Sequence, residues 1–315
     1  MRRFDFQDIN LMPRKCIVGS RSECDTQITL GPCAFNMPVV PANMECVINE
    51  EVAIKLAQSG YFYIYHRFNI DLLSFSLRMK NLGLPLSISL GVNQPDYELL
   101  NLLKSEDCIP DYITIDIAHG HSIKMEAMIK YISLTFPSVF IIAGNVSTAE
   151  AVKDLEAWGA NAIKVGIGPG SACTTYTATG FGSRNTQASV IEECSRASSR
   201  ALIIADGGIK EPGDIAKALV IGADMVMVGG MFSALTDSPG STVRGTDGQL
   251  YKEFWGSASA FQNGKKNRIE GTKKLLPLKN HSVLEEMNYL KECLQSAISY
   301  GGGKTVPDLK LVTYF

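Results

Sequence analysis

Residues 162–175 read AIKVGIGPGSACTT, a short apolar run followed by three glycines, a cysteine and two threonines. The apolar run predicts a buried strand, and the glycines predict a tight turn where the backbone can approach a ligand closely. Cys173 is therefore expected on a loop at a strand end, where its thiol is available for chemistry. Most cysteines are small buried hydrophobes, so this loop alone also allows a purely structural interpretation.

The same succession of an apolar strand and an amphipathic helix repeats along the chain after an irregular lead-in over 1–36. We expect strands at 38–44, 61–65, 86–92, 112–117, 139–143, 162–165, 201–205 and 225–228. Helices are expected at 49–60, 71–82, 95–104, 123–134, 148–158 (capped by Ser147), 187–198, 214–221 and 283–298. Continuous apolar strands indicate a parallel sheet buried on both faces. Eight such units predict an α/β fold, the (β/α)8 TIM barrel, with an open doubly wound sheet as the alternative.

In a TIM barrel, the loops at the carboxyl ends of the strands carry the chemistry. The segment at about 238–280 is inserted between strand 8 and its helix and is too long for a plain connection. We expect it to be a mobile active-site flap, although its glycines and basic residues are also typical of a solvated loop. Residues 1–315 would then form a single barrel domain.

The composition narrows the class of function. Hydrophobic residues make up 45% and charged residues 20% of the 315, as in an ordinary globular enzyme. The formal net charge of −2 gives no reason to expect nucleic acid or a membrane as a partner. The eight cysteines contain no Cys-x-x-Cys pair, which argues against a zinc ribbon. No signal peptide or membrane span is recognised, so a reducing cytoplasm is expected.

Paired glycines follow the seventh and eighth predicted strands, at Gly207-Gly208 and Gly229-Gly230. At these positions of a barrel, backbone N–H groups typically form a phosphate cradle. Asp206, beside the first pair, is suited to accept hydrogen bonds from two ribose hydroxyls; the alternative is that it caps a helix. A phosphate, a ribose and a nearby thiol point to a nucleotide attacked at its base.

A cysteine nucleophile must be ionised, whereas an unperturbed thiol is mostly protonated at neutral pH. Thr175 could relay a proton if an ionisable group reaches it, and the flap offers Glu270. Asp116 ends the fourth strand next to His119 and His121, where a hydrogen-bonding wall for a second ligand fits better than a metal site. Arg67, at the end of the second strand, faces the same rim and could meet a phosphate.

The motifs at 166–175, 205–209 and 144–146 resemble those of the IMP dehydrogenase and GMP reductase family over nearly the whole chain. The motifs at 20–23 and 42–44 resemble the reductase branch. The dehydrogenases usually insert a regulatory domain after the second strand, and 67–86 leaves no room for one. The flap also lacks the Arg-Tyr pair with which dehydrogenases activate water.

The resemblance implies a reaction in which Cys173 attacks C2 of GMP and expels ammonia, leaving a thioimidate that hydride from NADPH converts to IMP. Thr175 and Glu270 would handle the proton of the leaving ammonia. The implied substrate-binding residues are Asp206, Gly207, Gly208, Gly229, Gly230, Gly256, Ser257, Ala258, Arg268 and Gly271. The implied cofactor-binding residues are Ser20, Arg21, Arg67, Asp116, Ile117, Ala118, Ile167 and Gly168.

The resemblance also implies a monovalent cation such as K⁺ on the carbonyls of Gly168, Gly170 and Cys173, and a homotetramer. The chain departs from the family pattern beside this loop, with Tyr176 where a basic residue is common and a longer stretch at 182–187. A compact IMP dehydrogenase and a non-catalytic purine-nucleotide sensor are the alternative functions. A flavin-binding barrel with the same phosphate cradle is a more distant one.

Overall fold

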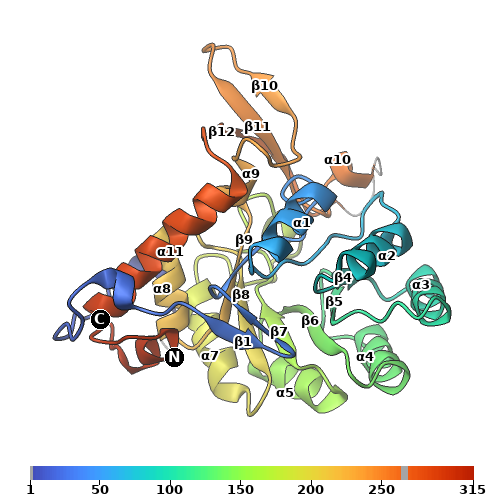
Figure 1. Ribbon diagram of the computed structural model, residues 1–315, viewed down its shortest axis with the longest axis horizontal. Helices are drawn as coiled ribbons and strands as arrows, with labels where there is room; N and C mark the ends of the chain where they lie inside the picture. The colour runs from blue at the N-terminus through green and yellow to red at the C-terminus, as the bar shows by residue number, and fades with distance from the viewer. Residues whose placement is uncertain (1–2, 264–268) are drawn as a thin grey trace.

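The computed structural model describes residues 3–263 and 269–315 of the chain. Its main sheet is parallel and curls into a barrel wall with the order β3-β9-β8-β7-β6-β5-β4, and helices lie along the outside (Figure 1). The predicted (β/α)8 class is therefore confirmed. The strands are β3 (Val39–Pro41), β4 (Ser87–Leu90), β5 (Tyr112–Asp116), β6 (Phe140–Val146), β7 (Ala162–Val165), β8 (Leu202–Asp206) and β9 (Met225–Val228).

Helices return the chain from the end of one strand to the start of the next. They are α1 (Glu50–Gln58), α2 (Leu72–Leu82), α3 (Gln94–Ser105), α4 (Ile123–Thr135), α5 (Ala149–Trp158), α7 (Gln187–Ala197), α8 (Pro212–Val220) and α11 (Val283–Tyr300). Short helices α6 (Thr175–Thr179) and α9 (Gly230–Ser233) follow β7 and β9. Among the residues described, no helix is both long and apolar enough to cross a bilayer.

The predicted cap of α5 is wrong. Thr148, not Ser147, is the N-cap residue, and its side chain accepts the N–H of Ala151. Ser147 has a different partner, because its hydroxyl accepts the N–H of Ile167 at 3.0 Å. This hydrogen bond attaches the end of β6 to the glycine-rich loop that follows β7.

The segment 61–65, predicted as the second strand, takes the position of a strand without forming the hydrogen-bond ladder of one. Its side chains alternate between the two faces of the wall, but only Tyr65 forms a bridge, to Ile88 of β4. The Ser87 N–H donates instead to the hydroxyl of Tyr63, which also donates to the carbonyl of Pro85. A tyrosine hydroxyl therefore replaces the backbone partner that a regular ladder would use.

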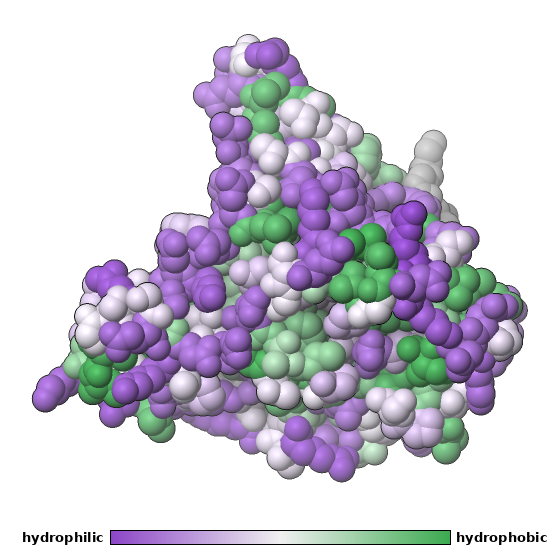
Figure 2. Space-filling model, viewed as in Figure 1, coloured by the Kyte–Doolittle hydropathy of each residue, from purple (hydrophilic) through white to green (hydrophobic). Residues whose placement is uncertain are grey.

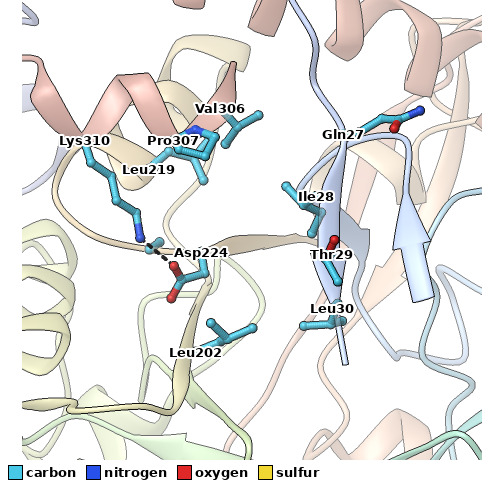
Figure 3. Close-up of a pocket in the computed structure, with 11 residues that line it drawn as sticks. Gln27, Ile28, Thr29, Leu30, Leu202, Leu219, Asp224, Val306, Pro307 and Lys310 are labelled. Carbon is cyan, nitrogen blue, oxygen red and sulfur yellow. Dashed lines mark hydrogen bonds and ion pairs between the residues drawn. The ribbon is translucent and has the colours of Figure 1, made fainter. Parts of the chain in front are cut away.

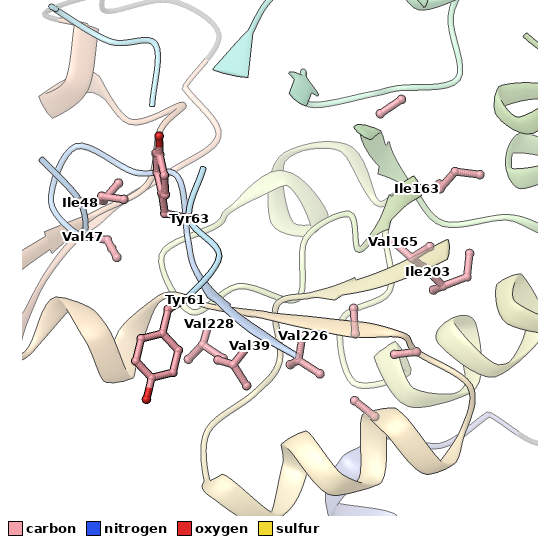
Figure 4. Close-up of a cluster of buried hydrophobic side chains, with 14 of the residues drawn as sticks. Val39, Val47, Ile48, Tyr61, Tyr63, Ile163, Val165, Ile203, Val226 and Val228 are labelled. Atoms are coloured by element: carbon pink, nitrogen blue, oxygen red, sulfur yellow. The ribbon is translucent and has the colours of Figure 1, made fainter. Parts of the chain in front are cut away.

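Alternation along the strands divides the apolar residues into two clusters. One lies between the sheet and the helices and includes Val39, Val226 and Val228, which Figure 4 shows on adjacent strands. The other fills the barrel interior and includes Ile142 and Ile204. Both clusters are buried, which accounts for the continuous apolar strands of the sequence.

An antiparallel hairpin closes the amino-terminal end of the barrel. It consists of β1 (Ile28–Leu30) and β2 (Cys33–Phe35), and the Tyr112 hydroxyl donates to the Leu30 carbonyl at 2.6 Å. The chain termini lie side by side, because the Asn10 N–H donates to the Phe315 carbonyl (Figure 1). The remaining short helices are η1 (Phe6–Asp8), η2 (Arg21–Glu23) and η3 (Val306–Leu311).

Much of the flap at 238–280, expected as a long loop, is a three-stranded antiparallel sheet. Its strands are β10 (Thr242–Arg244), β11 (Leu250–Trp255) and β12 (Lys273–Pro277), and α10 (Ala260–Asn263) lies between the last two. The β10–β11 hairpin projects from the barrel, and its outer end is mostly hydrophilic in Figure 2. The base of the same sheet faces the barrel mouth through the buried Phe254, whereas the buried Trp255 packs against Phe261 of α10.

Candidate active site

A cavity of about 1060 Å³ opens at the carboxyl ends of the barrel strands and is partly covered by the base of the flap. Segments far apart in the sequence converge on its wall, as expected for the catalytic end of a barrel. The predicted site residues that line it are Cys173, Thr175, Glu270, Asp206, Gly207, Gly208, Gly229, Gly230, Gly256, Ser257, Ala258, Arg67, Asp116, Ile117, Ala118, Ile167, Gly168 and Gly170.

Three polar side chains form a continuous hydrogen-bonded chain in this wall. Cys173 Sγ lies 3.2 Å from Thr175 Oγ1, and Thr175 donates to Glu270 Oε2 at 2.6 Å. Cys173 and Thr175 belong to the loop after β7, whereas Glu270 comes from the flap. A proton can therefore move between the sulfur and a carboxylate through one hydroxyl, which is the arrangement that general acid–base chemistry requires.

Backbone pairing between the flap and the cysteine loop positions Glu270. Cys173 forms an antiparallel bridge to Gly271, and the Thr174 N–H donates to the Glu270 carbonyl at 2.9 Å. Gly271 also bridges to Ser259 and lies in the flap pairing, not in the cavity wall. The remaining flap residue of the predicted substrate set, Arg268, lies outside the described residues.

The glycine pair after β8 adopts the conformation that a close backbone approach requires. Gly207 and Gly208 have φ of +91° and +83°, a region that side chains disfavour. A Cβ on Gly207 would also lie 3.1 Å from the Gly170 nitrogen, so the two glycine-rich loops pack backbone to backbone. Gly229 and Gly230 follow the neighbouring strand β9 at the start of α9, where they leave backbone N–H groups available to an anion.

Lys164, a buried lysine at the centre of the barrel mouth, is a site residue that was not predicted from the sequence. Its Nζ lies 3.2 Å from Asp116 Oδ1 and 3.2 Å from Asp206 Oδ2, with 2% of its side chain exposed. The signal was present, because Lys164 interrupts an apolar strand at an inward position in register with Ile204 of β8. Neighbouring amides complete the network, since Asn43 donates to Asp116 and Asn145 donates to Asp206.

This network controls protonation. Burial alone would raise the pKa of Asp116, but Lys164, Asn43 and Arg67 together lower it below its ordinary value. Burial alone would lower the pKa of Lys164, but Asp116 and Asp206 raise it. Asp116 therefore carries negative charge and Lys164 positive charge at neutral pH.

The wall on the Asp116 side contains polar atoms without protein partners. Arg67 donates to the Asp116 carbonyl at 3.3 Å and stacks on Phe68, but its buried Nε has no hydrogen-bond partner among the residues that the structure describes. The Oδ1 atom of Asn145 is likewise buried and unpaired. His66, next to Arg67, is buried, and burial lowers its pKa to about 4. One unpaired donor and one unpaired acceptor at this wall fit a polar ligand.

Ser20 and Arg21 do not line the cavity within the chain. They lie at η2, where the Arg21 guanidinium donates to Ser296 and Tyr300 near the carboxyl end of α11. The residue of α11 that lines the cavity is Tyr289, in the amino-terminal half of this helix. The assignment of Ser20 and Arg21 to a cofactor therefore stays a prediction.

A second, smaller cavity of about 360 Å³ lies away from this chemistry. It is bounded by Ile28 and Leu30 of β1 and by Leu202, Leu219 and Val306, with the Asp224–Lys310 ion pair at its edge (Figure 3). His121, which follows β5 in the sequence, pairs with Asp154 of α5 at 2.8 Å. Within 3–263 and 269–315, no cluster of three or more His, Cys, Asp or Glu side chains is arranged to hold a metal ion.

A family model and the curated relatives of this chain point to the same protein family. A sequence model of the IMP dehydrogenase/GMP reductase domain matches residues 76–315. Similar curated proteins named GMP reductase occur in Acidovorax sp. (strain JS42), Clostridium acetobutylicum and Mesoplasma florum, with 50%, 51% and 49% identity. These alignments cover 100%, 99% and 100% of this chain and 96%, 94% and 98% of the three relatives.

Proposed function

The chain belongs to the IMP dehydrogenase/GMP reductase family, and we propose on that premise that it catalyses the NADPH-dependent reductive deamination of GMP to IMP. The observation that carries this proposal is the hydrogen-bonded series Cys173–Thr175–Glu270 in one cavity with Asp206 and the glycine pairs. The three residues of the series supply a nucleophile and a proton relay. Asp206 would bind the ribose, and the glycine pairs would bind the phosphate.

The proposed reaction begins when the Cys173 thiolate forms a bond to C2 of the purine. The C2–N bond breaks, and the amino group leaves as ammonia after it takes up a proton that Glu270 delivers through Thr175. A thioimidate then links the sulfur to C2. Hydride addition at C2, followed by cleavage of the C–S bond, gives IMP and returns the thiolate.

A nicotinamide dinucleotide supplies the hydride when it is bound. The side of the cavity formed by Arg67, Asp116–Ala118 and Ile167–Gly168 fits such a group, because the unpaired Arg67 Nε and Asn145 Oδ1 can bond a polar ring substituent. Asp116 would orient this ligand. The 2′-phosphate that distinguishes NADPH from NADH would need cationic partners, and we assign Ser20 and Arg21 to the dinucleotide.

Three further features belong to the proposal. The carbonyls of Gly168, Gly170 and Cys173 would hold K⁺, which would keep the cysteine loop in one conformation. The chain would act as a single barrel domain in a cytoplasmic homotetramer. The flap at 238–280 would open to admit GMP and close to bring Glu270 to Thr175.

The test compares two substrate pairs on the purified chain. GMP with NADPH should give equimolar ammonia, IMP and oxidised cofactor, whereas IMP with NAD⁺ should give no xanthosine monophosphate. C173A should bind GMP but release no ammonia, which would separate an enzyme from a nucleotide sensor. Turnover only in the IMP direction, or ammonia release by C173A at the wild-type rate, would contradict the proposal.

A further inference from the structure

Lys164 has no role in the reaction as described, yet it occupies the centre of the barrel mouth. Its ammonium contacts two carboxylates at 3.2 Å, the Asn43 Oδ1 atom at 3.3 Å and the Met227 sulfur at 3.5 Å. Because both carboxylates lie within hydrogen-bonding distance of one nitrogen, they cannot be farther apart than twice that distance. Asp116 and Asp206 are thus held together through Lys164.

The neighbouring strand packs closely against the backbone of Lys164. Gly144 of β6 is the register partner of Lys164, and a Cβ at Gly144 would lie 2.5 Å from the Cβ of Lys164. Real Cβ atoms essentially never approach so closely, so no larger residue fits opposite the lysine without displacing it. The close packing of β6 against β7 therefore fixes the point from which the Lys164 side chain enters the barrel mouth.

The charges that face Lys164 come from several elements. Asp116 ends β5 and Asp206 ends β8, while Asn43 after β3 and Met227 on β9 are neutral. Arg67 contributes a second positive charge, but it faces Asp116 and bonds its main-chain oxygen. Without Lys164, two largely buried carboxylates would share the mouth, and such pairs usually retain one proton between them.

We propose that Lys164 is a positioning residue that keeps Asp116 and Asp206 ionised at the same time and holds their oxygens toward the cavity. The inference rests on the proposed function, in which Asp206 binds the ribose and Asp116 faces the cofactor. Lys164 thereby links the ribose-binding side of the site, at Asp206, to the cofactor-binding side, at Asp116, through electrostatic attraction. An ionised Asp206 accepts hydrogen bonds from both ribose hydroxyls, whereas a protonated one loses part of that capacity.

The consequence is a difference in the pH dependence of nucleotide binding. In the wild type, the phosphate of GMP itself takes up a proton at about pH 6, so the wild-type Kd at each pH is the reference for the variants. In K164M, the carboxylate pair should take up a proton as the pH falls, and GMP should bind more weakly at the acidic end. A purely structural role for Lys164 would change the affinity without changing this pH profile.

The experiment is calorimetric titration of GMP into the full chain, without cofactor, between about pH 6 and pH 9. The Kd of K164M should rise roughly 10- to 100-fold from the basic to the acidic end, the range expected for hydrogen bonds to a charged group. The double variant K164M/D116N removes one of the two carboxylates, so the pH dependence of its Kd should again match that of the wild type.

K252M is the matched control. Lys252 is also a buried lysine, but its ammonium donates to the carbonyls of Ser238 and Gly240 and, within 3–263 and 269–315, contacts no carboxylate pair. Replacing Lys252 should therefore leave the pH profile of GMP binding the same as in the wild type. If circular dichroism shows that K164M is unfolded, K164Q takes its place. If both single variants are unfolded, the double variant decides: a folded K164M/D116N supports the proposal, and an unfolded K164M/D116N contradicts it.

Two failures can be told apart. A K164M protein whose Kd for GMP follows the same pH profile as the wild type would overturn the role of Lys164 and leave the proposed reaction intact. A wild-type protein that does not bind GMP at any pH would overturn the proposed function, and the role of Lys164 with it.

Discussion

At the scale of single residues, the sharpest prediction concerns Glu270. Its carboxylate reaches Cys173 only through Thr175, so E270Q should slow ammonia release by roughly 100-fold or more while GMP affinity stays within about threefold. Single-turnover ammonia release and GMP titration would measure the two effects. The control is E253Q, which changes a glutamate of the same flap that pairs with Lys273. Equal rates for E270Q and E253Q would remove Glu270 from the relay.

Residues on motif loops were easier to predict than the residues that support them. Cys173 stands out because glycines and a strand end surround it, and Asp206 because it precedes a glycine pair. Lys164 was read as part of an apolar strand, because one charged residue does not change the period of a strand. Its importance depends on Asp116 and Asp206, which lie on two other strands and meet it only in the closed barrel.

At the scale of elements, the fit between β6 and β7 makes a testable prediction. G144A should cost roughly 1 to 3 kcal/mol in the free energy of unfolding, because the added methyl would collide with the Lys164 side chain. Urea denaturation would measure the loss. The control is G213A in α8, where a Cβ meets nothing within 4 Å and a glycine-to-alanine change should stabilise by about 0.5 to 1 kcal/mol. Equal stability of G144A and wild type would show that the strands adjust freely.

The closed flap depends on a second element contact. The Gln262 side chain accepts from Trp255 Nε1 at 2.9 Å and donates to Glu45 Oε2 at 2.6 Å, which connects the flap to the loop after β3. Q262A should remove this partner from the buried Trp255 N–H and the half-buried Glu45 carboxylate, favour an open flap and raise the KM for GMP roughly tenfold. Steady-state kinetics would measure it beside K274A, which removes an exposed charge from the same sheet. If Q262A and K274A have the same KM for GMP, Gln262 does not hold the flap over the site.

Sequence periodicity predicted the barrel strands and helices well, because each is a local pattern with both faces of the sheet buried. It overestimated 61–65, whose apolar alternation is that of a strand although a tyrosine hydroxyl occupies the backbone position at Ser87. The same periodicity did not predict the flap sheet. Strands β10 to β12 are short and mixed in polarity, and their pairing joins residues such as Trp255 and Lys273 across an intervening helix.

At the scale of the whole molecule, acid should destabilise the fold in two successive pH ranges. Glu156 of α5 accepts backbone N–H groups of Ser199, Arg200 and Ala201, which connects the helix to the turn before β8. Burial alone would raise the pKa of Glu156, but these bonds and the Ser198 hydroxyl lower it to about 2. Its stabilisation is complete above its ordinary pKa of 4.5 and is lost as the pH falls from there toward 2. E156Q should flatten the urea-midpoint profile in this lower range only.

His66 should produce the loss of stability at higher pH. Burial lowers its pKa from 6.5 to about 4 in the folded protein, so between these values the unfolded chain binds a proton that the folded chain does not. The free energy of unfolding should therefore decrease as the pH falls from 6.5 to about 4, by roughly 3 kcal/mol. H66Q keeps a side-chain acceptor for the Phe68 N–H but cannot be protonated, so its urea midpoint should stay level over this range. If H66Q and wild type lose stability in parallel between pH 6.5 and pH 4, another buried group controls the acid sensitivity of the barrel.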